Sequence, residues 1–307
     1  MAEKLYKNDF KKKSTNEKRN VNPTRNREHN KKSFEEKEEK EYYRKEEAPE
    51  MRLNKLVASR SKLSRREADK AIEEGRVKIA TKVVTNPGAQ VKKDVVLFLD
   101  NRFLKQDDGE FTVLVYNKGK GELVTHNDPQ GRKTIFHVLP TKYRHFLPIG
   151  RLDFASEGLI LLTDSAEVAQ RLMESDIPRT YNVKIDGPLT EPMFEAMREG
   201  LVLDDARAGG HEKSHITRMN FAPFLNYKVL KVGAKTSRIR VTITEGQNRE
   251  LRRFFAAFER KVMDLKRVGF GEVTLDNLPT NKRRYLSKQE YHHLHLFLND
   301  ARKEEKK

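Results

Sequence analysis

The feature that most restricts the fold of this chain is an abrupt rise in hydrophobic content near residue 50. Only ten of residues 1–50 are apolar or aromatic, whereas the same residues include 15 Lys/Arg and 12 Asp/Glu. So few apolar side chains cannot offset the chain entropy that folding would cost. We therefore expect residues 1–50 to form a disordered charged extension, with a partner-binding tail as the alternative, and folded structure to begin at residue 51.

The excess of positive charge is most concentrated directly after this extension. The formal net charge is +17, and residues 51–98 hold 12 Lys/Arg against 5 Asp/Glu. Such a local excess favours a polyanion, and nucleic acid is the usual one. The chain has no cysteine, which excludes disulfides and thiolate catalysis. Neither a secretory signal in Met1 to Phe10 nor a run of ~20 apolar residues is present, so we expect a cytoplasmic protein without membrane contact.

The first folded elements are predicted to be two short helices. Apolar residues recur at helical spacing between residues 51 and 60. Ser64 and Glu67 have the spacing of a capping box, in which each side chain binds the backbone N–H of the other residue. Gly75 stands where a helix would end. Two alternating apolar segments between residues 77 and 99 are predicted to follow as a β-ribbon.

Three segments of this region resemble the RNA-binding domain named after ribosomal protein S-four. They are Arg52-Leu53-Asn54-Lys55-Leu56, Ser64-Arg65-Arg66-Glu67-Ala68 and Glu74-Gly75-Arg76-Val77. Ile79-Ala80-Thr81 departs from the usual Val-Asn-Gly, which predicts an altered ribbon turn. The resemblance implies that residues 51–99 bind structured RNA, with a solvated basic helix face as the alternative. The side chains expected to contact RNA are Arg52, Lys55, Arg65, Arg66 and Arg76.

A larger domain is predicted over residues 111–298. Residues 100–110 are polar and include Asp107-Asp108-Gly109, which predicts a linker. Residues 299–307 are predicted to be a charged C-terminal tail. Between these segments, strand and helix patterns alternate without regular βαβ units, so we expect an α+β fold with a mixed or antiparallel sheet.

A loop bracketed by glycines precedes a short apolar strand in the middle of this domain. The loop reads Gly150-Arg151-Leu152-Asp153-Phe154-Ala155-Ser156-Glu157-Gly158, and Leu159-Ile160-Leu161-Leu162 follows it. By its chemistry alone, Asp153 is one of 46 acidic residues, for which a structural role is the ordinary expectation. The loop and strand together, however, resemble the signature of pseudouridine synthases.

Three further motifs resemble the RsuA/RluB group of ribosomal RNA pseudouridine synthases and follow in the group's order. They are Asn117-Lys118 with Asp128 and Gly131-Arg132, then Arg179-Thr180-Tyr181, then Glu245-Gly246-Gln247-Asn248-Arg249-Glu250-Leu251-Arg252-Arg253. Two positions depart from the group. Gly119 replaces the usual proline, which predicts a looser loop, and Gln247 replaces the usual arginine, which predicts the loss of a phosphate contact.

The resemblance implies an isomerase that converts uridine to pseudouridine without a cofactor or a metal. The bond between C1′ and N1 breaks, the base rotates, and C1′ rejoins at C5. The target base must first leave its stack, which costs a few kcal/mol. By the same resemblance, Asp153 is the essential acid, Tyr181 stacks on the flipped base, and Arg252 pairs with Asp153 and keeps it ionised. Addition to the base, attack at C1′ and removal of a sugar proton all remain open as the role of Asp153.

The catalytic domain also has residues that are expected to contact RNA phosphates. By resemblance and charge, these are Lys118, Arg151, Arg249 and Arg253. An exposed basic helix face is the alternative for the last two, and a core tyrosine is the alternative for Tyr181. Residues 211–215 match the zinc-protease pattern H-E-x-x-H, but Gly209-Gly210 and the lack of an apolar period predict a polar loop instead.

The form of the third motif, with Asn248 and Arg249 after glycine, favours the large-subunit branch of the group. The expected partner is therefore 23S ribosomal RNA in a pre-ribosomal or protein-poor state, bound by a monomer. Modification of 16S ribosomal RNA is the alternative within the family. A non-catalytic RNA-binding or ribosome-assembly factor is the alternative from another class.

Overall fold

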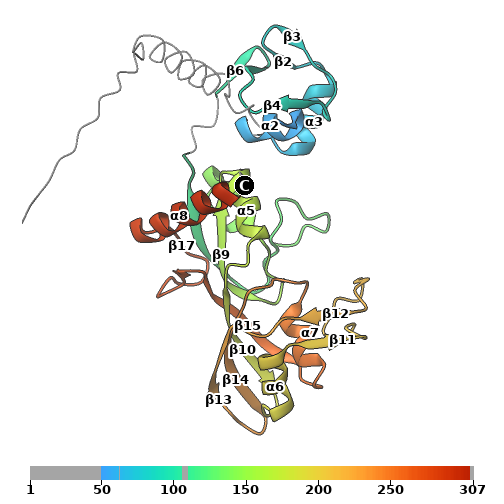
Figure 1. Cartoon of the computed structure of the whole chain (residues 1–307), viewed down its shortest axis with the longest axis vertical. Helices are drawn as coiled ribbons and strands as arrows, with labels where there is room; N and C mark the ends of the chain where they lie inside the picture. Colours follow the sequence, from blue (N-terminus) through green and yellow to red (C-terminus); the bar gives the residue numbers. More distant parts are fainter. Residues whose placement is uncertain (1–49, 62, 106–109, 305–307) are drawn as a thin grey trace, which may run out of the picture. The chain divides into compact units, whose positions relative to one another are not determined.

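The computed structural model describes residues 50–61, 63–105 and 110–304 (Figure 1). Residues 1–49 of the predicted extension and part of the predicted linker and tail therefore lie outside the described residues. The chain forms two compact units, the first ending at Phe103 and the second continuing from Leu104, with Val57–Glu67 grouped with the second. Residues 50–104 together are here named the small unit, and residues 110–304 the large unit. Within the described part, no helix is both long and apolar enough to cross a bilayer.

The first elements are helices α2 (Leu53–Arg60) and α3 (Arg65–Glu73). The predicted capping box is present at the start of α3. The backbone N–H of Ser64 donates to Glu67 Oε2 at 2.7 Å, and that of Glu67 donates to Ser64 Oγ at 3.3 Å. Gly75 ends the helix with a φ of +72°, a conformation that glycine adopts without steric cost.

The strands of the small unit pair differently from the predicted two-stranded ribbon. Strand β2 pairs with both β3 and β5, and β6 extends this four-stranded sheet from the segment that was predicted to be a linker. Strands β1 and β4 pair in a separate two-stranded sheet. The strands are β1 (Glu50–Arg52), β2 (Val77–Ile79), β3 (Lys82–Val83), β4 (Gln90–Lys92), β5 (Leu97–Leu99) and β6 (Arg102–Leu104). Ala80 forms the turn between β2 and β3 at a φ of +51°, a conformation that asparagine adopts more readily than alanine.

The large unit is built on a mixed sheet that has nine strands among the described residues. Its strand order is β13-β14-β10-β15-β9-β7-β17, with β8 paired to β9 and β16 paired to β15. Neighbours are antiparallel except β15 and β9. The strands are β7 (Val113–Lys118), β8 (Leu147–Ile149), β9 (Glu157–Thr163), β10 (Arg179–Asp186), β13 (Asn226–Lys231), β14 (Thr236–Ile243), β15 (Val262–Phe270), β16 (Val273–Thr274) and β17 (Arg283–Tyr285). The predicted α+β class is confirmed.

Both faces of β7 and β9 are buried. Helices α5 and α8 pack with apolar side chains on one face, and α4 with a 3-10 turn packs on the other. This explains the continuous apolar run of β9, because a strand covered on both sides has no solvent-facing position. The elements are α4 (Ile135–Val138), the 3-10 turn (Thr141–Tyr143), α5 (Ala166–Glu174) and α8 (Lys288–Glu304).

Strands β10 and β14 instead alternate between buried and accessible side chains. Helices α6 and α7 and the hairpin of β11 and β12 cover one face with apolar side chains. In Figure 1 they lie to one side of these strands. The elements are α6 (Glu191–Glu199), α7 (Glu250–Ala256), β11 (Leu201–Leu203) and β12 (Met219–Phe221). The opposite face is polar.

Local hydrogen bonds define the starts of two helices of the large unit. Helix α5 is capped by Ser165, whose Oγ accepts from the backbone N–H of Val168, whereas Asp164 accepts from that of Thr112. Helix α7 begins after Arg249 rather than at Asn248, because the carbonyl and side-chain oxygens of Asn248 accept from Arg253 instead of capping the helix.

Candidate active site

The loop with Asp153 connects β8 to β9, and two glycines set its path. Gly150 has a φ of +75° and Gly158 has a φ of +109°. A Cβ atom at Gly158 would lie 2.1 Å from the carbonyl oxygen of Arg267 on β15. Only glycine permits this approach of β9 to β15. The glycine at the end of the sequence motif is therefore a requirement of the parallel strand pair that anchors the loop.

Asp153 forms an ion pair with Arg252 of α7. The distance from Arg252 Nε to Asp153 Oδ2 is 3.3 Å, with side-chain exposures of 11% and 32%. Arg252 also donates to Ser156 Oγ at 3.1 Å and to the Val262 carbonyl at 3.2 Å. Its guanidinium thus holds both ends of the loop turn while the carboxylate stays partly accessible. Burial lowers the pKa of Arg252, and the negative charge of Asp153 opposes that shift.

Lys118 lies beneath this loop, so the prediction that it contacts RNA is wrong. Its side chain is 0% exposed, and its ammonium donates to the carbonyls of Gly119, Asp153 and Ser156 at 2.9, 3.1 and 2.7 Å. Burial lowers the pKa of Lys118 to about 8. A side chain without access to solvent cannot reach a phosphate, and Lys118 instead fixes the backbone on either side of the turn.

The segment after Lys118 is anchored at several points, although Gly119 replaces the proline of the resembled motif. The backbone N–H of Gly119 donates to Glu122 Oε2 at 3.3 Å, a bond that proline could not form. The buried Glu122 also accepts from the hydroxyl of Tyr116 at 2.9 Å. Gly121 donates to the carbonyl of Phe154 at 2.8 Å. The prediction of a looser loop is therefore wrong.

Tyr181 lies on β10, on the face that α6 and α7 cover. It is 8% exposed and belongs to the same apolar cluster as Leu152, the residue before Asp153. In the sheet it stands opposite Val241 and Arg267. The fold thus brings the tyrosine motif, the Asp153 loop and the α7 motif to one region of the large unit.

The other arginines of the Asp153 loop and of the third motif differ in accessibility. Arg151 is exposed, and Arg249 is half-buried with its Nε donating to the Gly209 carbonyl at 2.8 Å. Arg253 is 0% exposed and donates to the carbonyl of Ala206 and to Ser214 Oγ. The prediction that Arg253 contacts phosphate is therefore wrong, because its guanidinium is buried and forms its hydrogen bonds inside the protein. Gln247 likewise uses its amide on Asn220 and Glu245.

In the small unit, the cations that were predicted to bind RNA differ in the same way. Arg52, Arg65 and Arg66 are exposed, and Lys55 is half-buried. Arg76 is committed to Asp100, with Nε–Oδ1 and Nη2–Oδ2 distances of 2.7 and 2.6 Å. Arg65 and Arg66 are adjacent and both exposed at the start of α3.

Ser156 is part of the Asp153 loop motif, but the sequence alone predicted no role for it. Its hydroxyl accepts from Arg252, its carbonyl accepts from Lys118, and its backbone N–H closes the turn on the Asp153 carbonyl at 3.0 Å. Residues 211–215 form a loop with turns rather than a helix, as predicted.

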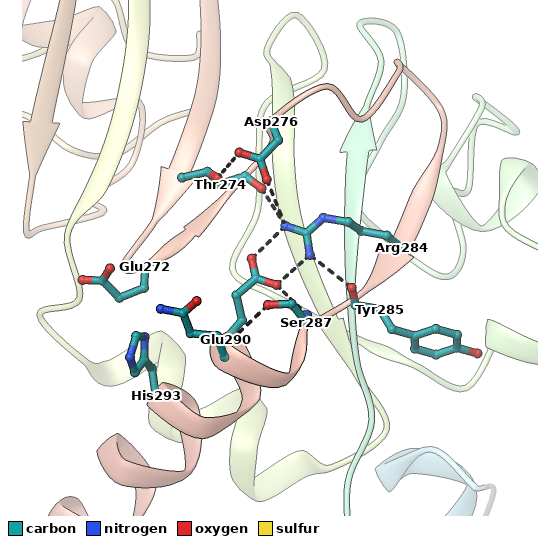
Figure 2. Close-up of a pocket in the computed structure, with 9 residues that line it drawn as sticks. Glu272, Thr274, Asp276, Arg284, Tyr285, Ser287, Glu290 and His293 are labelled. Carbon is teal, nitrogen blue, oxygen red and sulfur yellow. Dashed lines mark hydrogen bonds and ion pairs between the residues drawn. The ribbon is translucent and has the colours of Figure 1, made fainter.

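A separate pocket lies at the junction of β16, β17 and the start of α8 (Figure 2). Arg284 crosses it and forms two 2.7 Å bonds to the carboxylate of Glu290. Glu290 also accepts from the backbone N–H of Ser287, which caps α8. The charged groups of this pocket satisfy one another and join the C-terminal helix to the sheet, so they do not form the reaction site.

The sequence profiles of two known families match this chain. The sequence profile of RNA pseudouridylate synthases matches residues 112–257, and that of the S4 domain matches residues 51–97. An RNA pseudouridine synthase of Helicobacter pylori strain 26695 is 49% identical over 252 residues, which cover 82% of this chain and 96% of that protein. The chain belongs to the RNA pseudouridine synthase family.

Two further relatives support this family. The ribosomal large subunit pseudouridine synthase B of Bacillus subtilis is 31% identical over 243 residues, covering 78% of this chain and 93% of that protein. A crystal structure of a pseudouridylate synthase aligns with a TM-score of 0.54 and 27% identity, covering 80% of this chain and 99% of that one. The pseudouridine synthase profile spans Asp153, Tyr181 and Arg252. The predicted family, its RNA-binding module and its class of enzyme are confirmed.

Proposed function

We propose that this pseudouridine synthase isomerises a uridine of the large-subunit (23S) ribosomal RNA, with Asp153 as the essential acid. The observation that carries the proposal is the partly accessible carboxylate of Asp153, held 3.3 Å from the guanidinium of Arg252. The large-subunit target is supported by the names of the relatives in Bacillus subtilis and Yersinia pestis.

In this proposal, Arg252 orients Asp153. The guanidinium donates to Ser156 of the same loop and to the carbonyl of Val262 on β15, so it ties the loop to the sheet. Tyr181 provides an aromatic surface next to Leu152, on which the flipped uracil would stack. The chemistry of isomerisation is supplied by protein side chains, and the proposal includes neither a metal nor a cofactor.

RNA binding is assigned to the residues that remain accessible. Residues 51–99 would act as the RNA-binding domain through Arg52, Arg65 and Arg66, with Lys55 and Arg76 as secondary contacts. Residues 111–298 would act as the catalytic domain, in which Arg151 and Arg249 contact the phosphates around the target. Extrusion of a uridine needs access to its strand, which favours a pre-ribosomal or protein-poor RNA. The proposal takes the enzyme to be a monomer.

The test of this proposal is Asp153→Asn. We expect this variant to bind RNA with unchanged affinity but to form no pseudouridine, because the amide neither ionises nor attacks. Pseudouridine would be mapped by carbodiimide-dependent primer extension in ribosomal RNA from cells that carry either form. Asp205→Asn, in an exposed loop, is the matched control and should remain active. Normal turnover by Asp153→Asn would overturn the catalytic assignment.

The same mapping tests the target. Cells without this protein should lose pseudouridine at a single region of the 23S ribosomal RNA and keep all of those in the 16S ribosomal RNA. A loss confined to the 16S ribosomal RNA would overturn the large-subunit target but leave the activity in place. No loss from either RNA would favour a non-catalytic role.

A further inference from the structure

Several Lys and Arg side chains lie together on the polar face of the large sheet. Strands β10 and β14 place Tyr181, Val183 and Ile239 on the face that α6 and α7 cover, so the residues between them face the other way. Leu265 of β15 and Tyr227 of β13 pack against the same covered cluster, so their neighbours Lys266 and Lys228 lie on the polar face. A bulge between Val229 and Lys231 shifts the alternation of β13 and brings Lys231 opposite Arg238 on the same face. The cations of this face, here named the basic sheet face, are Lys184, Lys228, Lys231, Arg238, Arg240 and Lys266.

Strand register arranges these cations in two rows. Lys228 stands opposite Arg240, Arg240 opposite Asn182, and Asn182 opposite Lys266. The second row lies two residues away on β14 and β10 and three residues away on β13, which has a bulge between Val229 and Lys231. In this row Lys231 stands opposite Arg238, and Arg238 opposite Lys184. Adjacent strands are about 4.8 Å apart, and alternate residues of one strand are about 7 Å apart. Figure 1 shows β13, β14, β10 and β15 as neighbours in this part of the sheet.

Like-charged residues that stand opposite each other in these rows destabilise the folded sheet. Three directly opposed pairs, Lys228 with Arg240, Lys231 with Arg238 and Lys184 with Arg238, have like charges, which destabilises a sheet. Among the described residues, none of the six cations forms an ion pair. Their only close hydrogen bond to a side chain is that of Arg240 to Asn182. In the strand register, Lys184 stands opposite Asp264 and Lys266 opposite Glu157, and the other four cations stand opposite no carboxylate.

The carboxylates near the basic sheet face do not neutralise it. Asp264 stands opposite Lys184 and pairs with Lys120, which adds a seventh cation at the same edge. Asp186 accepts from the backbone N–H of Lys261. Glu157 stands opposite Lys266 at the junction of β9 and β15. Three carboxylates thus face seven cations, and the remaining field is strongly positive.

The basic sheet face also adjoins the candidate active site. Lys120, which pairs with Asp264 on this face, precedes Gly121, which donates to the carbonyl of Phe154 beside Asp153. On the other side, Lys266 stands opposite Glu157 at the end of the Asp153 loop. A single polyanion strand that leaves the site would meet these cations at the strand junction.

We propose that the basic sheet face binds the phosphate backbone of the substrate RNA outside the flipped nucleotide. This inference rests on the proposed function, because it takes the occupant to be the RNA that Asp153 modifies. Two rows of cations that outnumber the nearby carboxylates match a continuous chain of phosphates, and phosphate contacts orient an RNA without reading its sequence. In this proposal the two faces of the sheet have different roles. The flipped base binds on the apolar side, and the flanking RNA backbone binds on the basic side.

The test is the triple variant Lys228→Gln, Lys231→Gln, Arg238→Gln in the full chain. Binding of a fluorescein-labelled 30-nucleotide RNA hairpin would be titrated between 50 and 200 mM salt. Three lost phosphate contacts should reduce the slope of log Kd against log salt by about 2, at ~0.7 per contact. Across this fourfold salt range, the variant's rise in Kd should then be roughly 16-fold smaller than that of the wild type. An unchanged slope would overturn the inference.

Control variants separate charge from folding. Arg144→Gln, Lys213→Gln, Lys288→Gln removes the same charge from exposed sites elsewhere and should keep the wild-type slope. Lys228→Arg, Lys231→Arg, Arg238→Lys keeps the charges and should keep the affinity. The triple glutamine variant should melt no earlier than the wild type, because it relieves like-charge pairs. An equal loss of slope in the exposed-site control would also overturn the inference.

Two further outcomes have separate meanings. In the first, the wild type binds RNA, the triple variant has a reduced salt slope, and neither protein forms pseudouridine. This outcome would support RNA binding by the basic sheet face and contradict the proposed function. If the wild type forms pseudouridine and the triple variant binds and turns over normally, the proposed function holds and this inference fails. Loss of binding to phosphatidylserine vesicles with unchanged RNA binding would assign the face to a membrane and overturn its assignment to RNA.

Discussion

At the scale of single residues, burial separates the cations that can bind RNA from those that build the site. Lys118 and Arg253 are both 0% exposed, and the ammonium of Lys118 donates to three carbonyls at or near Asp153. Arg151, Arg65 and Arg66 are exposed. Residue type alone does not distinguish the two groups, since each consists of Lys or Arg within a matching motif. What distinguishes them is the number of internal acceptors around the charge.

The role of Lys118 can be tested with Lys118→Met. This variant removes the donor to the carbonyls of Asp153 and Ser156, and a displacement of about 1 Å in a reacting group costs about 10²-fold in rate. We expect kcat to fall by about that factor while KM for RNA changes less than twofold, as measured in single- and multiple-turnover assays.

A phosphate-binding role for Lys118 would give the opposite split, with KM raised and kcat kept. The matched control is Lys288→Met at an exposed position, which should change neither constant. Thermal melting of Lys118→Met is the accompanying measurement, because the uncovered carbonyls would each cost about 1–3 kcal/mol if no water replaced the lysine.

At the scale of elements, the start of helix α7 combines a functional motif with a buried acid. Glu250 is 5% exposed, and its carboxylate accepts from the backbone N–H of Gln247. Burial raises the pKa of Glu250 to about 7, against which the bond from Gln247 acts. The acid sits two residues before Arg252, so its protonation and the anchoring of the helix are linked.

This raised pKa predicts how stability depends on pH. Between about pH 4.5 and 7 the folded protein holds a proton that the unfolded chain releases, so the free energy of unfolding falls as pH rises through that window. Glu250→Gln keeps an acceptor for Gln247 and removes the titration. We expect it to be more stable than the wild type at pH 8, by up to about 3 kcal/mol, and similar at pH 4.5.

Urea unfolding at several pH values measures this difference. Glu191→Gln is the control, because Glu191 also begins a helix but its side chain is 73% exposed. A difference between Glu250→Gln and the wild type that stays constant from pH 4.5 to 8 would contradict the prediction.

At the scale of the whole molecule, the net charge of +17 is distributed over surfaces with different tasks. The small unit presents Arg65 and Arg66 at the start of α3, where helix N–H groups also favour phosphate. The large unit presents the basic sheet face. An RNA bound by both would release counterions at each, and the salt dependence of binding is the sum of these contributions.

The contribution of the small unit is tested by Arg65→Ala with Arg66→Ala. We expect weaker RNA binding and a salt slope that is flatter by about 1.5, at ~0.7–0.9 per phosphate contact. Lys70→Ala with Lys82→Ala removes the same charge from exposed positions of the same unit and should leave the slope unchanged. A normal slope in the arginine variant would show that α3 does not contact phosphate.

The sequence by itself determined the family, the order of the motifs, the capping box at Ser64 and the glycines around Asp153. These features depend on residues close together in the chain, so local spacing reveals them. Only the tertiary structure decided that Lys118 and Arg253 are internal, that β2 pairs with β5, and that cations of β10, β13, β14 and β15 form one face. Burial and strand register are set by partners far apart in the sequence, and no local pattern specifies them.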